Sequence, residues 1–216
     1  GQLIGPQELR LKPYKLMGLK VIRYSPKERT TPNFCGEDAL IRFYKDPNEY
    51  KDWNGDINTV ITVAQSMRRR GSHCGYDIFA NECPKVCNPI LFGVGNEDSQ
   101  YNGGRLSFPN LQKVLQNHRA FFYTGTHPAS YTLAFIEAWV TGIPIVSIGP
   151  GLGNASWLPG HKLWEIDSLI ENERTGFWSD KPEDRMYYMK SLLDYPNLAK
   201  AISVNGRNMA IEIFGK

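Results

Sequence analysis

Short apolar runs alternate with amphipathic segments over most of this chain, and the pattern predicts alternating strands and helices. The runs Thr59–Val63, Ala120–Tyr123 and Pro144–Ile148 carry no charge and are rich in β-branched or aromatic residues, as is typical of strands buried on both faces. Between the last two runs, apolar residues recur at helical spacing from Leu133 to Val140. We therefore expect an α/β domain with a parallel sheet of about six strands.

The segment from residue 120 to residue 153 predicts one strand–helix–strand unit. Its first loop, Thr124–Pro128, contains the glycine and proline of a turn, and Ser130 is a candidate N-cap for the helix. Gly142 stands where helices commonly end in a left-handed residue. In open parallel sheets, ligands bind where such a loop opens a helix, because free amides and the helix dipole point into the crevice. We place a candidate binding site at this loop.

Glu137 is the unusual residue of the predicted helix, because its neighbours are apolar. A buried carboxylate is costly unless it is paired or hydrogen-bonded. The residues alone allow two interpretations. Glu137 lies on the solvent edge of the helix or bonds a nearby backbone amide, or it accepts hydrogen bonds from ligand hydroxyls, as acidic residues do with ribose.

The rest of the chain divides into an N-terminal extension with a linker, residues 1–55, and a larger domain, residues 56–216. In the extension, the apolar segments Leu19–Tyr24 and Ala39–Tyr44 predict two short strands with a polar loop between them. His118 is expected on the surface or at a helix end. In the larger domain we also expect a strand at residues 90–94, a polar loop at 97–104, and helices at 76–82, 109–119, 182–194 and 196–214.

Composition narrows the class of protein. The chain has 216 residues, of which 41% are hydrophobic, and this is enough for one sizeable core. A net charge of +3, with basic residues spread along the chain except at Arg68–Arg70, does not favour nucleic-acid binding. No apolar run approaches the roughly 18 residues of a membrane span, and no signal peptide opens the chain. We expect a soluble cytoplasmic protein without a membrane span.

The four cysteines leave three alternatives open. A zinc site could be formed by His73, Cys74, Cys83 and Cys87, but their spacing is far from the paired CxxC pattern of structural zinc sites. A disulfide is the second alternative. Free thiols are the prediction that we favour, and we expect no metal site.

Three segments together resemble one enzyme family. In residues 135–146, FIEAWVTGIPIV, an apolar residue precedes Glu-Ala, and Gly-x-Pro and two apolar residues follow. This order is similar to the donor-site signature of GT-B glycosyltransferases, in particular the large retaining family four. Residues 170–177 and 202–214 resemble two later motifs of that family, in the same order. The resemblance covers about residues 58–216 and implies the C-terminal, donor-binding half, with a Rossmann-like parallel sheet and flanking helices.

The resemblance also implies roles for particular residues. Glu137 would bind the ribose of a nucleotide-diphosphate sugar, while Gln65 and Arg70 stand where the family has two basic residues that hold the diphosphate. Arginine can form bidentate hydrogen bonds with phosphate, whereas Gln65 is neutral and would bind the diphosphate more weakly. His127 and Arg70 are the catalytic candidates. The remaining implied donor-binding residues are Gly93, Gly125, Thr126, Ser130, Tyr131 and Thr132.

One departure from the family concerns the donor sugar. The family usually has two glutamates with seven residues between them, and counting back from Glu137 places Ala129 at the first position. In the family that first glutamate contacts the sugar. Three alternatives follow: His127 or Ser130 supplies a substitute polar contact, the catalytic power is low, or the donor sugar is unusual.

The resemblance implies a hexosyltransferase that transfers a sugar, with retention, from a nucleotide-diphosphate sugar to an unknown acceptor, without a metal or other cofactor. The alternative is a non-catalytic nucleotide-sugar-binding module that needs a missing domain, supplied by a partner chain, by self-association or by a longer polypeptide. An unrelated enzyme of similar fold, such as a sugar epimerase that uses His127 with Asp167, also stays open.

Overall fold

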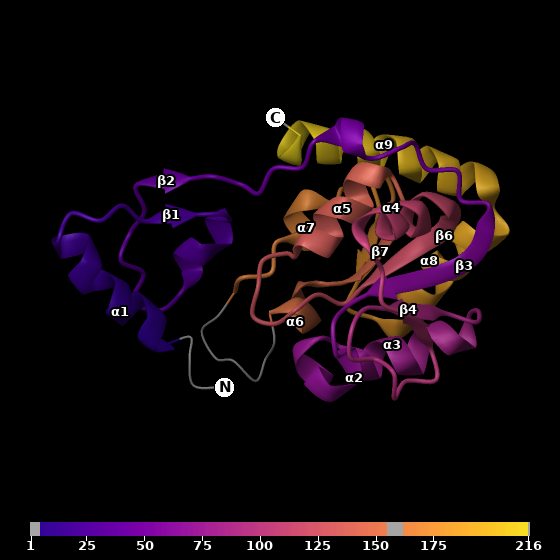
Figure 1. The fold of residues 1–216 in the computed structure, drawn as a ribbon, viewed down its shortest axis with the longest axis horizontal. Helices are drawn as coiled ribbons and strands as arrows, with labels where there is room; N and C mark the ends of the chain where they lie inside the picture. The colour runs from indigo at the N-terminus through magenta and orange to yellow at the C-terminus, as the bar shows by residue number, and fades with distance from the viewer. Residues whose placement is uncertain (1–4, 155–161, 216) are drawn as a thin grey trace.

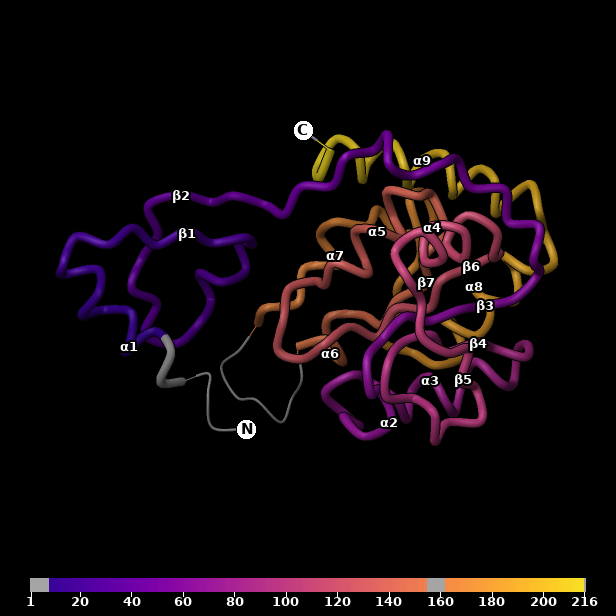
Figure 2. Tube along the Cα trace, in the orientation of Figure 1, coloured from indigo at the N-terminus to yellow at the C-terminus, as the bar shows by residue number. Residues whose placement is uncertain are grey.

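The structure is a computed structural model, which describes residues 5–154 and 162–215. These residues form a large α/β domain and a small N-terminal unit, joined by an extended linker (Figure 1). The linker runs beside the C-terminal helix before the chain enters the sheet (Figure 2). The small unit and the linker occupy the residues for which the sequence predicts an extension.

Six parallel strands form the sheet of the large domain, in the order β5–β4–β3–β6–β7–β8. The chain enters at a central strand, builds one edge with β4 and β5, and then crosses back to place β6 on the other side of β3. The prediction of a parallel sheet of about six strands is confirmed. The strands are β3 Ile57–Val63, β4 Ile90–Phe92, β5 Asn102–Gly104, β6 His118–Tyr123, β7 Ile145–Ile148 and β8 Phe177–Ser179.

Helices cover both faces of this sheet (Figure 1). Val60 and Ile61 on β3 are fully buried and belong to opposite cores, and so do Phe121 and Phe122 on β6. Because both faces are covered, the buried parts of the central strands, residues 59–63, 120–123 and 145–148, are uncharged. No described helix is both long and apolar enough to cross a membrane. The helices are α2 Met67–Arg70, α3 Tyr76–Glu82, α4 Phe108–Asn117, α5 Leu133–Thr141, α6 Pro150–Gly153, α7 Ile166–Leu169, α8 Pro182–Asp194 and α9 Pro196–Phe214.

Helix α5 begins later than the sequence suggests. Its N-cap is Thr132, whose Oγ1 accepts a hydrogen bond from the Phe135 N–H at 3.4 Å, so the prediction of Ser130 as the cap is wrong. Either residue has a hydroxyl that can cap a helix, and the tertiary fold decides between them. Gly142 ends the helix in the left-handed region with φ of 91°, as predicted.

The expectation for the edge strand is also wrong, whereas His118 occupies one of its two expected positions, the end of a helix. Residues 102–104, expected in a polar loop, pair with β4 as the edge strand β5. Helix α4 ends at Asn117, and His118 opens β6. The His118 side chain is buried, with Nδ1 2.7 Å from the Val114 carbonyl oxygen, rather than on the surface.

The N-terminal unit consists of α1 Gly5–Leu16 and a parallel pair of short strands, β1 Ile22–Arg23 and β2 Ala39–Leu40. Arg23 donates from both terminal nitrogens to the Glu8 carboxylate, each at 2.8 Å, and both side chains are buried. This ion pair ties β1 to α1, while Ile22 and Leu40 remain exposed. Four 3₁₀ turns complete the described elements: η1 Pro26–Thr30, η2 Pro47–Glu49, η3 Gly71–His73 and η4 Cys83–Lys85.

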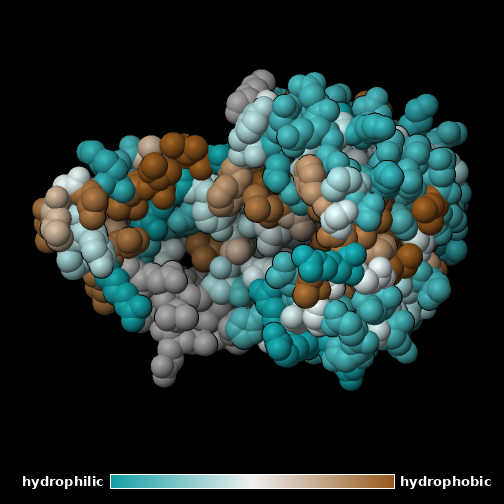
Figure 3. Space-filling view, viewed as in Figure 1, coloured by the Kyte–Doolittle hydropathy of each residue, from teal (hydrophilic) through white to brown (hydrophobic). Residues whose placement is uncertain are grey.

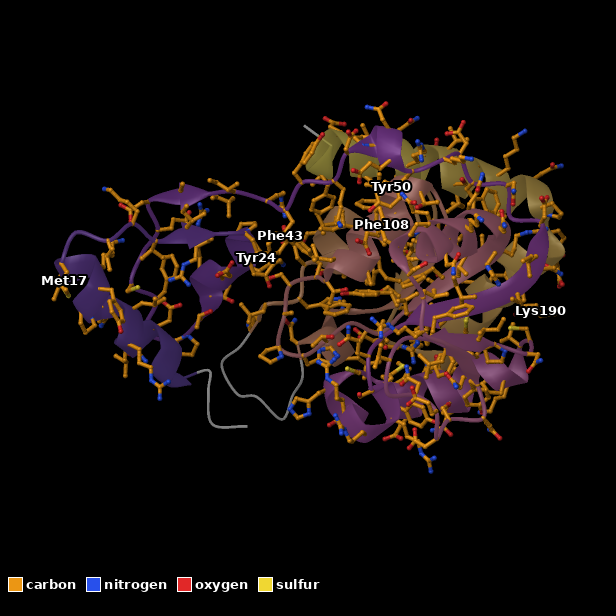
Figure 4. All side chains as sticks on the ribbon, viewed as in Figure 1. Met17, Tyr24, Phe43, Tyr50, Phe108 and Lys190 are labelled. Carbon is orange, nitrogen blue, oxygen red and sulfur yellow. The ribbon has the colours of Figure 1, made fainter. Side chains whose placement is uncertain are left out.

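The N-terminal unit and the large domain meet at a polar and aromatic junction. Arg42 pairs with the buried Glu165 at 2.5 Å and lies 5.8 Å above the ring of Tyr131. Tyr24 stacks on Phe43 with ring centroids 5.0 Å apart, and both lie between the two parts of the molecule in Figure 4. The Tyr131 hydroxyl donates to the Tyr24 carbonyl oxygen at 2.7 Å. The segment that precedes α5 therefore packs against the N-terminal unit.

A buried ion pair joins α8 to α3 on one face of the sheet. The Arg185 Nε donates to Glu82 Oε2 at 2.9 Å, and its Nη1 donates to the Ser179 carbonyl oxygen at 2.7 Å. Arg185 is 1% exposed and Glu82 is 5% exposed. Removing one partner would leave the other as an uncompensated buried charge.

We expect Arg185→Met to lower the free energy of unfolding by about 3–5 kcal/mol, because it leaves Glu82 buried without its cation. Lys190→Met on the same helix removes an exposed pair with Asp194 (Nζ to Oδ2, 2.7 Å) and should cost less than about 1 kcal/mol. Urea unfolding of both variants measures the difference. Equal losses in the two variants would contradict the assignment.

Candidate functional site

A cavity of about 460 Å³ opens at the carboxyl ends of β3 and β6, where the strand order reverses. This is the place where open parallel sheets bind ligands. Its walls come from the loop after β3, the turn after β4, the loop after β6 and the first turns of α5. The lining residues are Thr62, Val63, Ala64, Gln65, Arg70, Gly93, Val94, Arg105, Leu106, Leu111, Phe121, Phe122, Tyr123, Thr124, Gly125, Thr126, Thr132, Leu133, Ala134 and Glu137.

A second hollow, of about 600 Å³, lies between the linker, α9 and the start of β6. It sits at the amino ends of the strands, where Arg119 follows the first residue of β6. Neither the loops that follow the strands nor the start of α5 reach it. The smaller cavity is therefore the better candidate site.

Two glycines of the cavity wall have backbones that other residues adopt only with strain. Gly93 has φ of +132°, and a Cβ there would lie 2.2 Å from the Ala64 carbonyl oxygen. Gly125 has φ of +76°, and a Cβ there would lie 2.4 Å from the Trp164 ring. The absence of side chains lets the neighbouring loops approach closely and shapes the cavity.

Positive charge borders the cavity. The side chains of Arg70 and Arg105 are exposed and both line it. Thr132 and Leu133, at the amino end of α5, also line it, so the positive end of the helix dipole faces the same space. This combination favours an anionic ligand. Sequence reasoning missed Arg105, although a basic residue that directly follows a Gly-Gly pair could have drawn attention to it.

Glu137 brings one negative charge to the same cavity. Its Oε1 lies 2.5 Å from Nζ of Lys45, a linker residue, and its side chain is only 12% exposed. Glu137 is thus neither a solvent-edge residue nor bonded to a neighbouring amide through its carboxylate. It is a paired carboxylate at the wall of a cavity, and it remains available to accept hydrogen bonds from hydroxyl groups.

Of the sequence-predicted site residues, seven line the cavity: Gln65, Arg70, Gly93, Gly125, Thr126, Thr132 and Glu137.

Ser130 and Tyr131 are not in its lining. The Ser130 N–H donates to the Tyr24 hydroxyl at 3.1 Å, and the Tyr131 side chain is buried at the junction with the N-terminal unit. Because α5 starts only at Leu133, these two residues precede the helix and pack on the other unit.

His127, a predicted catalytic residue, is also absent from the lining. Its ring is 5% exposed, packs 5.5 Å from Trp164, and places Nδ1 2.9 Å from the Gly153 carbonyl oxygen. Burial lowers the pKa of His127, which favours the neutral imidazole. Its position argues against direct contact with a ligand in the cavity.

All four cysteines are free thiols, as predicted, so the disulfide alternative is wrong. Cys74 and Cys83 are buried, and burial raises the pKa of both thiols. Within residues 5–154 and 162–215, no group of three or more His, Cys, Asp and Glu side chains is arranged to hold a metal ion. The zinc alternative is therefore not supported by the arrangement of His73 and its neighbouring cysteines.

Comparisons with known proteins address the fold. No protein-family profile matches the chain, and no curated sequence is significantly similar to it. Solved structures do match: HepE from Anabaena in complex with UDP and glucose has a TM-score of 0.67 at 15% identity, over 96% of this chain and 63% of HepE. Sucrose-phosphate synthase from Thermosynechococcus elongatus has a TM-score of 0.68 at 14% identity, over 96% of this chain and 58% of the synthase.

One matching structure is an isolated domain. It is the C-terminal domain of LpcC, a glycosyl transferase group 1 protein from Francisella tularensis. The match covers 78% of this chain and 97% of the LpcC domain, with 11% identity and a TM-score of 0.52. The fold is that of a GT-B C-terminal domain. The chain spans less than two thirds of HepE and of the synthase. The GT-B resemblance of the sequence is thus confirmed at the level of fold, while the roles of its residues stay predictions.

The buried imidazole predicts a pH dependence of stability for this GT-B domain. Because the pKa of His127 is lowered on folding, the unfolded chain binds the proton more readily, and stability falls as pH drops below the unfolded value of about 6.5. His127→Gln should reduce this loss, by at most about 1.4 kcal/mol per pH unit. Urea unfolding between about pH 7.5 and about pH 5.5 measures it.

His118 provides a comparison, because burial also lowers its pKa. His118→Gln should likewise flatten the pH dependence, and the double variant should flatten it further. If the free energy of unfolding of the His127→Gln variant depended on pH as steeply as that of the wild type, His127 would not be buried as a neutral group.

Proposed function

We propose that this chain is the donor-binding part of a glycosyltransferase that uses a nucleotide-diphosphate sugar. The observation that carries the proposal is Glu137, a carboxylate at the wall of a cavity that Arg70, Arg105 and the start of α5 also line. A carboxylate suits the hydroxyls of a ribose, and the positive groups suit a diphosphate. Solved structures of HepE, which has the same fold in this region, contain UDP or UDP-glucose.

The chemistry proposed for these residues is electrostatic. Transfer breaks the bond between the anomeric carbon and the diphosphate oxygen, and the electron pair leaves with the nucleoside diphosphate. The acceptor hydroxyl oxygen forms the new bond to the anomeric carbon, and its proton passes to the departing diphosphate. Arg70, Arg105 and the amides at the start of α5 would stabilise the negative charge that develops on the departing diphosphate. Gln65 adds a neutral hydrogen-bonding group beside them. Retention of configuration is proposed from the family resemblance.

The acceptor side calls for a further unit. The N-terminal unit has only a two-stranded parallel sheet, and such sheets are normally covered on both faces. Apolar residues gather on its surface in Figure 3. We propose that an α/β acceptor domain completes it, within a longer polypeptide or as a partner chain. The exposed apolar side chains include Leu9, Leu16, Met17, Leu19, Ile22, Leu40 and Ile41.

A cytoplasmic location is part of the same proposal. Four free thiols suit a reducing compartment. The non-catalytic alternative would bind the nucleotide sugar without transferring or hydrolysing it.

Glu137→Gln should weaken the affinity for the correct nucleoside diphosphate by about 1–3 kcal/mol, because a neutral amide replaces a charged acceptor of ribose hydrogen bonds. Calorimetric titration with UDP, GDP and ADP measures the effect and identifies the base. Glu183→Gln, which changes an exposed carboxylate in the first turn of α8, is the matched control. Unchanged affinity in a folded Glu137→Gln variant would remove the ribose assignment.

Arg70→Ala should weaken nucleoside diphosphate binding by about 1.5–3 kcal/mol and leave nucleoside binding nearly unchanged, because the guanidinium is proposed to contact phosphate only. Arg69→Ala is the control, since Arg69 is exposed but does not line the cavity. Titration of each variant with UDP and with uridine separates the two contributions. Equal losses for both ligands would indicate a folding effect instead.

A further inference from the structure

Lys45 contacts the carboxylate that carries the proposed function. Its Nζ lies 2.5 Å from Glu137 Oε1, and the two side chains are only 19% and 12% exposed. The two residues are 92 positions apart, on the linker and on α5. Within the parts of the chain that the structure describes, Lys45 is the cation that forms an ion pair with Glu137.

The linker is held in place by α9. The Lys45 N–H donates to the Phe214 carbonyl oxygen at 2.9 Å, at the end of that helix. Farther along, Arg207 Nη2 donates to the Tyr50 carbonyl oxygen at 3.1 Å. Helix α9 packs in turn against α5, which carries Glu137. Helix α9 therefore holds both the backbone of Lys45 and the helix that carries Glu137.

On the protein side, the ion pair lies near a buried aromatic residue, Tyr50. Tyr50 is 2% exposed, and the centroid of its ring lies 6.1 Å from that of Phe108 (Figure 4). Burial, and then the negative charges of Glu137 and Glu49, raise the pKa of this phenol. The Glu137 side chain is itself only 12% exposed, and a carboxylate with so little contact with water is costly unless it is paired. Lys45 provides that pairing.

We infer that Lys45 is a positioning residue for nucleotide recognition, which holds the Glu137 carboxylate in an orientation in which Oε2 can accept hydrogen bonds from the ribose. The inference rests on the proposed function. A carboxylate offers about four lone-pair sites, and the contact of Lys45 is with Oε1. No residue of the described ranges donates a hydrogen bond to Oε2. The ion pair thus leaves an acceptor oxygen for the ligand rather than consuming the carboxylate.

Ribose-modified nucleotides separate this role from a general structural one. Lys45→Met, Lys45→Arg and the control Lys51→Met, which changes an exposed linker lysine, are titrated calorimetrically with UDP and with 2′,3′-dideoxy-UDP. Lys45→Met should weaken UDP binding about tenfold and dideoxy-UDP binding less than about twofold, since only UDP can use Glu137. Lys45→Arg should restore most of the UDP affinity, and Lys51→Met should resemble the wild type. The double variant Lys45→Met with Glu137→Gln should bind UDP no more weakly than Glu137→Gln alone.

Several results would overturn the inference. Equal losses for UDP and dideoxy-UDP would mean that Lys45 acts on the phosphates or on the fold. Unchanged or tighter UDP binding by Lys45→Met would mean that the lysine is irrelevant or competes with the ribose. The proposed function fails separately: a wild-type chain that binds none of UDP, GDP and ADP would remove the donor site and this inference with it. Wild-type binding of UDP without a ribose-selective effect of Lys45 would remove the inference alone.

Discussion

The pairing of β3 with β6 at the centre of the sheet is the constraint on which the candidate site depends. The chain builds one edge of the sheet after β3 and then returns to its other side, so the loops that follow these two strands diverge in opposite directions. A crevice at their carboxyl ends is the geometric result. Gly93 lets the Ala64 backbone approach closely, Gly125 leaves room for the Trp164 ring, and the amino end of α5 also lines the cavity. The cavity is therefore a property of the topology, and its charges are added by individual side chains.

The linker contributes more than a connection between two units. Within a few residues it supplies two cations to buried or nearly buried carboxylates, Arg42 to Glu165 and Lys45 to Glu137. The first pair attaches the N-terminal unit to the segment before α7, and the second reaches the wall of the cavity. Because both pairs are largely shielded from water, the loss of either cation would leave a carboxylate in unfavourable surroundings. The position of the linker and the state of the candidate site are physically coupled through these contacts.

Local sequence patterns were sufficient for most of the secondary structure, since hydrophobic periodicity and end signals act over a few residues. The helices Tyr76–Glu82, Pro182–Asp194 and Pro196–Phe214 have the bounds that were expected. Errors occurred where local signals were ambiguous. Ser130 and Thr132 are both able to cap a helix, and packing against Tyr24 occupies the Ser130 amide instead. The short edge strand β5 has a polar, glycine-rich sequence that also suits a loop, and its pairing with β4 is what makes it a strand.

The sequence by itself determined the α/β class and the parallel sheet. It also indicated Glu137 as a candidate site residue, because a carboxylate in an apolar helix is conspicuous in any arrangement of the chain. It also indicated the loops that line the cavity, since loops after parallel strands must meet at one edge. Only the tertiary structure decided that Arg105 lines the cavity, that Tyr131 and His127 do not, and that Lys45 pairs with Glu137. These outcomes depend on contacts between residues far apart along the chain. Such contacts are set by how the strands cross and how the linker follows α9, and no periodicity or spacing within a short segment encodes them.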